Sequence, residues 1–492
     1  MMTIDKKRIR FLVLTTLVFL FCAHAFCYAN LSFSGASVMV DASRSNSDLI
    51  SGGQFLASLY LRIRGALSAP MLVGMLSAVY LAIATVLIAD MLCLQHPLSL
   101  FMLSGALTLP VSVTAINASM LHLGDVYFLA LLFFTAGAWL CIRLPLGFVP
   151  AVCCFAAGMG LQPSMFAAGP ALVLIACTYQ ALCAKRVRMQ LFTIIKFLVS
   201  LFIGFLIYAA VAYLFSMRWG AEFSADWQTP MGEDLLSMWL FPIVTLLDTP
   251  TAYPLLCALI YLQLLAACWA LFLHKAPLPG KVFALLSLLL LPFSLNMPVF
   301  AASPVRAVRE QYVLCLLPVA LISLLDLLCG QLKKKAGGVL RVLFACAFGV
   351  TFLSSIVFSN QVYLKKNLEY QTTLSVMTRV VEQAEQTEGF IPGYTPVAIV
   401  GSLENSTIAM AHKGFEHLSA LDAAANNYTA SSQSENTWYF WEIMGYPFNF
   451  VSDGQRDALA ASDAVQSMPA FPAKGFCSTV DGILVIKLSP SM

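Results

Sequence analysis

The sequence predicts an all-α polytopic membrane protein, a bundle of about eleven transmembrane helices followed by a small C-terminal α/β domain. Of the 492 residues, 60% are hydrophobic and only 11% are charged, and the mean hydropathy is +0.82. A soluble domain carries about 25% charged residues. Residues 1–359 hold 21 Lys and Arg against 12 Asp and Glu, whereas residues 360–492 hold 7 against 13. The two parts therefore suit two solvents, the bilayer and water.

This composition excludes several classes of protein. A soluble globular enzyme, a disordered chain and a nucleic-acid-binding protein all need more charge than the chain has. An outer-membrane barrel has strands of alternating polarity and does not reach this hydropathy. We therefore predict membrane lipids as surroundings and no nucleic acid as a partner.

Apolar runs long enough to cross about 30 Å of hydrocarbon recur along the first 359 residues. The fifth run is short, and a turn at Gly160-Leu161-Gln162-Pro163 makes 146–183 either two spans or one re-entrant hairpin. In the first run, Ala23-His24-Ala25 is similar to a signal-peptidase site, but the run continues beyond it. The predicted spans are 11–29, 66–92, 98–117, 124–142, 146–160, 164–183, 191–215, 252–273, 282–300, 305–328 and 339–358.

The basic residues predict the orientation of the bundle. If the N-terminal Lys and Arg residues are cytoplasmic, every strongly basic short loop also falls inside, including Arg143, 185–188, 275–281 and 333–341. Eleven crossings then place residues 360–492 outside the cytoplasm. Most acidic residues of the first part lie in the predicted outer loops, and Asp90 and Asp326 lie at inner ends.

The polar tail predicts one compact α/β domain of about 130 residues. Residues 366–388 have an amphipathic helical pattern. Residues 397–403 predict a buried strand that ends at a glycine turn, and 481–489 predict a second strand after an Asp-Gly turn. An aromatic cluster at 438–450 lies between them.

The first outer loop, 31–65, is polar and carries Asp41 and Asp48. A carboxylate held at the bilayer surface can act as a general base towards a sugar hydroxyl. The alternative is that both are ordinary solvated loop aspartates.

A second candidate site opens the tenth span. Ser303-Pro304 is a good helix start, and Arg306, Arg309 and Glu310 follow in its first turns. Two arginines three residues apart share a helix face and can grip a phosphate at headgroup depth. The alternative is that they anchor the helix against lipid headgroups.

A third candidate group lies between the third and fourth spans, where Asn117, His122 and Asp125 meet the predicted outer surface. His122 is a candidate acid or base, although a lone histidine in a short loop is more often structural. No Walker loop, GxSxG or HExxH motif occurs. Carboxylates can bind a divalent metal, but no spacing here supports one, so no metal site and no cofactor are predicted.

Four stretches in this order resemble the GtrII-like family of bacterial membrane glucosyltransferases, which decorate O-antigen and other surface glycans. They are SDLISGGQFLASLYLRIRGALSAPMLVGMLSAVYLAIATVLIADML (47–92), LTLPVSVTAINASMLHLGDVYFLALLF (107–133), GMGLQPSMFAAGPALVLI (158–175) and MPAFPAKGFCSTVDGILVIKLS (468–489). Two departures are Gly53-Gln54 and Leu161-Gln162, where family members often have Gly-Arg and Tyr-Gln. If that arginine handles phosphate elsewhere, then Arg44, Arg62 or Arg306 replaces it here, or the donor differs.

The resemblance implies a GT-C type bundle in residues 1–359, with a first outer loop that carries an essential aspartate, and an extracytoplasmic domain in 360–492. By position Asp41 and Asp48 are the candidates, and Asp125 matches an aspartate of the family's fourth span. The implied donor is a polyprenyl-phosphate hexose, and the resemblance favours undecaprenyl-phosphate glucose. The implied acceptor is a surface polysaccharide such as the O-antigen of lipopolysaccharide, at the outer face of the bacterial cytoplasmic (inner) membrane.

With this resemblance, Asp41, Asp48 and Asp125 become the predicted catalytic residues, and His122, Arg306, Arg309 and Glu310 the predicted substrate-binding residues. Three alternatives remain open. The first is a flippase or transporter of lipid-linked sugars, which predicts internal repeats and broken helices. The second is another polyprenyl-linked group transferase. The third is a membrane protein without catalytic activity whose tail binds wall polymers.

Overall fold

The computed structural model describes residues 5–30, 46–65, 67–183, 187–219, 235–247, 276–296, 307–403, 415, 418 and 433–489. Within these ranges, nine helices are long and apolar enough to cross a membrane, and the shorter apolar helix Phe148–Leu161 accompanies them. They coincide with ten of the eleven predicted spans. The remaining predicted span, 252–273, lies outside the described residues. The prediction of a helical membrane protein is confirmed at this level.

Several of the spans consist of two helical pieces. The elements of the bundle are α1 (Lys6–Ala29), α4 (Pro70–Met91), α5 (Pro97–Thr108), α6 (Val111–Ser119), η3 (Leu121–Leu123), α7 (Gly124–Arg143), α8 (Phe148–Leu161), η4 (Pro163–Ala167), α9 (Ala168–Leu182), α10 (Val187–Trp219), α11 (Leu235–Leu247), α13 (Leu278–Leu295), η6 (Val308–Cys315), α14 (Leu316–Gln331) and α15 (Lys334–Glu385). Two short helices, α2 (Asn46–Ser51) and α3 (Phe55–Arg64), come from the first predicted outer loop.

Proline marks several of the breaks between these pieces. Pro70 and Pro97 stand in the first turns of α4 and α5, where a missing backbone N–H costs nothing. Pro110 separates α5 from α6, and Pro163 opens η4 directly after α8. The predicted turn at 160–163 is therefore confirmed.

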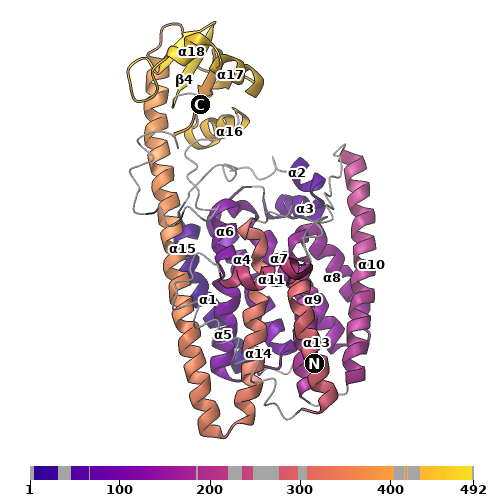
Figure 1. The fold of residues 1–492 in the computed structure, drawn as a ribbon. Helices are drawn as coiled ribbons and strands as arrows, with labels where there is room; N and C mark the ends of the chain where they lie inside the picture. Colours follow the sequence, from indigo (N-terminus) through magenta and orange to yellow (C-terminus); the bar gives the residue numbers. More distant parts are fainter. Residues whose placement is uncertain are drawn as a thin grey trace.

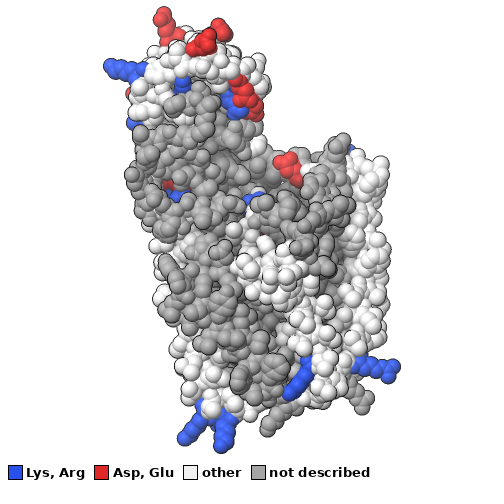
Figure 2. All heavy atoms as spheres, in the orientation of Figure 1, with Lys and Arg blue, Asp and Glu red and all other residues white. Residues whose placement is uncertain are grey.

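One end of the bundle, here called the basic end, gathers the loops that the sequence places on a single side. The Arg8 guanidinium donates to the side-chain oxygen of Gln95. Arg143 pairs with the buried Asp90, with Nε and Oδ2 3.0 Å apart. Figure 2 shows Lys and Arg side chains at this end and most of the visible Asp and Glu at the opposite, domain end.

A second ion pair fastens the same end. Asp326 in α14 accepts from Arg341 at 3.3 Å and from the Ser99 hydroxyl at 2.7 Å. It therefore ties the α14–α15 hairpin to the start of α5. These two ion pairs lie at one end of the bundle, and the side of the membrane that this end faces stays a prediction.

Helix α15 runs for 52 residues without a break and passes the predicted boundary at residue 359. At 1.5 Å per residue it is about 78 Å long, far more than about 30 Å of hydrocarbon. Figure 1 shows it along one side of the bundle with the C-terminal domain at its far end. The predicted amphipathic helix at 366–388 is thus the last part of a longer helix, and its buried residues Met377, Val380 and Ala384 face the domain core.

The domain contains a four-stranded sheet in the order β2-β1-β4-β3, with bounds β1 (Pro396–Val400), β2 (Asn449–Phe450), β3 (Cys477–Val480) and β4 (Ile483–Lys487). The central strands β1 and β4 are parallel, with Val397 opposite Leu484. Strands β3 and β4 form a hairpin through Asp481 and Gly482, whose φ angles are 51° and 77°. Both predicted strands and the Asp-Gly turn are confirmed.

The predicted aromatic cluster forms part of the domain core. Phe440, in the helical segment Tyr439–Met444 that follows α16 (Gln433–Trp438), is fully buried and stacks edge-on against Phe448, with ring centroids 4.8 Å apart. Two short helices, α17 (Asp453–Ala460) and α18 (Asp463–Ser467), complete the domain. The buried Lys487 connects the end of β4 to the end of α18, because its ammonium group donates to the carbonyl oxygens of Val465, Gln466 and Met468 at 2.8–2.9 Å.

Candidate functional site

A buried ion pair between Asp125 and Arg64 stands at the domain end of the bundle. Asp125 lies in the first turn of α7, and Arg64 is the last residue of α3. Their atoms Oδ1 and Nη1 are 2.5 Å apart, and the two side chains are 0% and 2% exposed. The positive end of the α7 dipole adds to the stabilisation of the carboxylate.

Tyr60 completes the coordination of this carboxylate. It stands one turn before Arg64 on the same face of α3 and donates its hydroxyl to Asp125 Oδ2 at 2.8 Å. The Tyr60 oxygen lies 3.2 Å from the hydroxyl of Tyr80 in α4. Burial and the neighbouring Asp125 carboxylate raise the pKa of Tyr60 far above its usual value. Tyr60 therefore stays protonated and serves as a donor at all physiological pH values.

Arg64 also bridges two elements. Its Nη2 donates to the backbone oxygen of His122 in η3 at 3.0 Å, and its guanidinium carbon lies 6.0 Å from the centroid of the Tyr60 ring. These contacts fix the plane of the guanidinium, which is pre-organised for recognising planar or tetrahedral oxyanions. Helix α3 thus supplies a rigid cation to the first turn of α7.

A second set of polar side chains adjoins the ion pair. Asn117 in α6 donates through Nδ2 to the Tyr28 hydroxyl of α1 at 3.1 Å and lies 3.5 Å from the Tyr363 hydroxyl of α15. Tyr363 in turn lies 2.7 Å from His24 Nδ1. A Cβ atom on Gly124 would lie 3.3 Å from Asn117 Oδ1, so Asn117 adjoins the residue before Asp125.

Three buried atoms of this region have hydrogen-bonding capacity that no described residue uses. They are Arg64 Nε, His122 Nδ1 and Asn117 Oδ1. A buried polar atom without a partner costs about 1–3 kcal/mol, so natural proteins keep few of them. Because these three lie around one ion pair, this region can donate hydrogen bonds to a polar ligand and accept them from it. We call Asp125, Arg64, Tyr60, His122 and Asn117 the Asp125 cluster.

The structure assembles only some of the predicted site residues. Asp125 and His122 belong to the cluster. Asp48 is exposed in α2, which packs beside α3 and α10, so the structure places it on a neighbouring element and gives no direct contact with Asp125. Asp41 lies outside the described residues, and its role stays a prediction.

The predicted arginine pair of the tenth span is described in part. Arg306 and Ser303-Pro304 lie outside the described residues. Arg309 and Glu310 belong to η6, a 3-10 helix that precedes α14, and they are partly exposed. Both act electrostatically on Tyr127, two residues after Asp125, and η6 packs against α6. They therefore approach the start of α7, but among the described residues the Asp125 carboxylate contacts Tyr60 and Arg64 rather than either of them.

Sequence reasoning missed Arg64, Tyr60, Tyr80 and Tyr28. One signal could have found the first two, because a tyrosine and an arginine four residues apart share a face of the apolar stretch LASLYLRIRG. An arginine in such a stretch needs a counter-charge. In α7, which begins at Gly124 and has 20 residues, Asp125 is the only acidic residue.

No metal centre is evident in the part of the chain that the structure describes, where no group of three His, Cys, Asp or Glu residues could hold an ion. The prediction that the protein needs no cofactor therefore stays a prediction. Comparisons of the chain with protein-family models, with curated proteins and with solved structures find no match.

Proposed function

We propose that the protein is an integral membrane glycosyltransferase that moves a hexose from a polyprenyl-phosphate donor to a surface polysaccharide. The observation that carries this proposal is the buried Arg64 at the end of an apolar bundle. Asp125 holds its guanidinium, and no described residue accepts from its Nε. The basic end of the bundle is then cytoplasmic, and the Asp125 cluster and the C-terminal domain face the opposite side of a bacterial inner membrane.

The physical chemistry of such a donor favours a site at this depth. A polyprenyl tail cannot leave the hydrocarbon, so the sugar–phosphate bond has to be cut where the chain of the lipid ends. The departing phosphate gains negative charge as that bond breaks. A pre-organised cation stabilises developing charge most effectively in a water-poor site, and arginine matches phosphate oxygens in a bidentate fork.

Within this proposal Arg64 binds the leaving phosphate, and Asp125 and Tyr60 are positioning residues that hold its guanidinium. His122, whose Nδ1 has no partner among the described residues, and Arg309 and Glu310 of η6 contribute further polar contacts to the donor. No metal is required for this step, because the cation is supplied by the chain itself.

The acceptor is activated by a loop carboxylate. Asp48 or Asp41 takes the proton of an acceptor hydroxyl, whose oxygen attacks the anomeric carbon as the bond from that carbon to the phosphate oxygen breaks. The phosphate leaves with the bonding electron pair, and a single displacement inverts the anomeric configuration. Asp48 suits this role because it is exposed and lies in the element beside α3, which carries Arg64.

Mass analysis of surface glycans tests the proposal in cells. Deleting the gene should remove one hexose from the glycan. The Asp48→Asn and Asp41→Asn variants are then each expressed in the deletion strain, and the glycan mass shows whether the hexose returns. We expect at least one of the two to fail, whereas Asp457→Asn, at an exposed aspartate of the C-terminal domain, restores it. A glycan of unchanged mass in the deletion strain would contradict the proposed function. Full restoration by both loop variants would refute the assignment of the base.

A further inference from the structure

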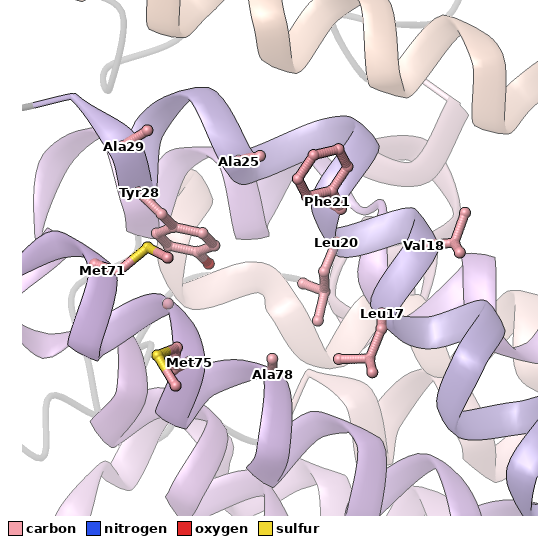
Figure 3. Close-up of a pocket in the computed structure, with 11 residues that line it drawn as sticks. Leu17, Val18, Leu20, Phe21, Ala25, Tyr28, Ala29, Met71, Met75 and Ala78 are labelled. Carbon is pink, nitrogen blue, oxygen red and sulfur yellow. The ribbon is translucent and has the colours of Figure 1, made fainter.

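An apolar groove of about 510 Å³ lies between α1 and α4. Its walls are formed by Leu17, Phe21 and Ala25 of α1 and by Met71, Met75 and Ala78 of α4, among others. Figure 3 shows these side chains along the two helices, with the Tyr28 ring pointing from α1 towards α4. Among the described residues that line the groove, Tyr28 alone has an oxygen or nitrogen atom in its side chain.

The groove faces the side of the bundle rather than its interior. Phe21 is 75% exposed, and Met71 and Met75 are 64% and 60% exposed. In a membrane, this side is covered by lipid chains. The α1 residues that line it run from Leu17 to Ala29, a rise of about 18 Å. This is about half of the hydrocarbon thickness, so the groove occupies the depth of one leaflet at the domain end.

Tyr28, at the domain end of the groove, joins the groove wall to the Asp125 cluster. The Tyr28 ring lies flat against Gly74, where a Cβ atom would come within 2.5 Å of it. Its hydroxyl accepts from Asn117, and Asn117 adjoins Gly124 and the start of α7. An amphiphile with its chain in the groove would therefore present its head group to the polar cluster.

We propose that the α1–α4 groove seats the isoprenoid chain of the donor and directs its phosphate towards Arg64. The inference rests on the proposed function, because the polar cluster alone does not select an isoprenoid over another chain. The groove supplies what such a ligand needs: an apolar wall with short side chains at Ala25, Gly74 and Ala78, a lateral opening, and an end that adjoins the Asp125 cluster through Tyr28 and Asn117.

Photocrosslinking of the full-length protein in lipid nanodiscs tests this assignment. The probe is undecaprenyl phosphate with a diazirine in its isoprenoid tail. We expect labelled peptides from α1 and α4. Ala78→Trp fills the groove and should reduce this labelling about tenfold or more, the scale on which apolar pockets discriminate between shapes. Val79→Trp is the matched control, since Val79 is 51% exposed on the same helix and does not line the groove.

Size-exclusion chromatography shows whether Ala78→Trp is folded. If it is not, Ala25→Trp replaces it in the test, because this variant fills the groove from α1. Labelling that maps away from α1 and α4, or that neither groove variant reduces, would overturn the inference. So would equal displacement of the probe by phosphatidylglycerol and by unlabelled undecaprenyl phosphate. Displacement by inorganic phosphate alone would likewise show that the tail does not determine binding.

The two proposals fail separately. Groove labelling that Ala78→Trp removes, in a protein that transfers no sugar from undecaprenyl-phosphate hexose, supports the lipid site and refutes the glycosyltransferase. Sugar transfer that survives Ala78→Trp and Ala25→Trp, with labelling elsewhere, supports the glycosyltransferase and refutes the groove assignment.

Discussion

Replacing Asp125 with alanine is expected to lower the free energy of unfolding by about 3–5 kcal/mol, because the Arg64 guanidinium is left buried without a counter-charge. Tyr60 loses its acceptor at the same time. Sugar transfer should disappear as well, since the guanidinium then keeps only the His122 carbonyl and the Tyr60 ring as contacts and loses the carboxylate that orients it. Reversible unfolding by detergent in mixed micelles measures the first effect, and a transfer assay on the folded fraction measures the second.

A double variant separates stability from activity. Arg64→Met with Asp125→Leu removes both charges and should recover most of the lost stability, because well-packed apolar residues can replace a buried ion pair. It should remain inactive. Asp326→Ala breaks the more exposed pair at the basic end and serves as the matched control, with a smaller loss of stability and normal activity. An Asp125→Ala protein as stable as the wild type would contradict the buried, charged state of the pair.

Arg64→Lys is expected to keep the ion pair but to reduce the transfer rate about 10²–10³-fold, the usual effect of removing one pre-organised donor from developing charge. Lysine carries the same charge but cannot reach Asp125, the His122 carbonyl and a phosphate with a planar fork. The loss should fall on kcat more than on the amount of folded protein.

The control for this variant is Arg341→Lys, which makes the same change in the Asp326 pair at the basic end. It should transfer sugar at the wild-type rate. If Arg64→Lys and Arg341→Lys were equally active, Arg64 would be a structural anchor, and the phosphate would have to be bound elsewhere.

Much of the bundle could be predicted because apolar runs and basic loops are local signals. Hydropathy nevertheless divided α15 into a span and a separate amphipathic helix. The helix continues through Asn360 because neither proline nor glycine occurs between 350 and 388, and backbone hydrogen bonding does not depend on the solvent around it. A change of solvent along a chain is therefore not evidence that a helix ends there.

The candidate site was predictable only in part. Asp125 stood out as an acid at the start of an apolar span, whereas its partner Arg64 lies 61 residues earlier. Choosing between Arg62 and Arg64 requires the orientation of α3 about its own axis, which sets one arginine outwards and the other against α7. The contact of Tyr28 with Asn117 was also hidden, because it joins α1 to α6 across 89 positions. Long-range pairings of this kind carry no local pattern.

The most direct test of the account uses purified protein, undecaprenyl-phosphate glucose labelled in the sugar, and polysaccharide from cells that lack the gene. We predict that the wild-type protein binds the lipid, releases undecaprenyl phosphate and labels the polysaccharide. The Arg64→Met, Asp125→Leu double variant should bind the lipid more weakly, release no undecaprenyl phosphate and leave the polysaccharide unlabelled. A folded wild-type protein that neither binds nor consumes the labelled lipid would contradict the central claim, that the Asp125 cluster is a site for a lipid-linked sugar phosphate.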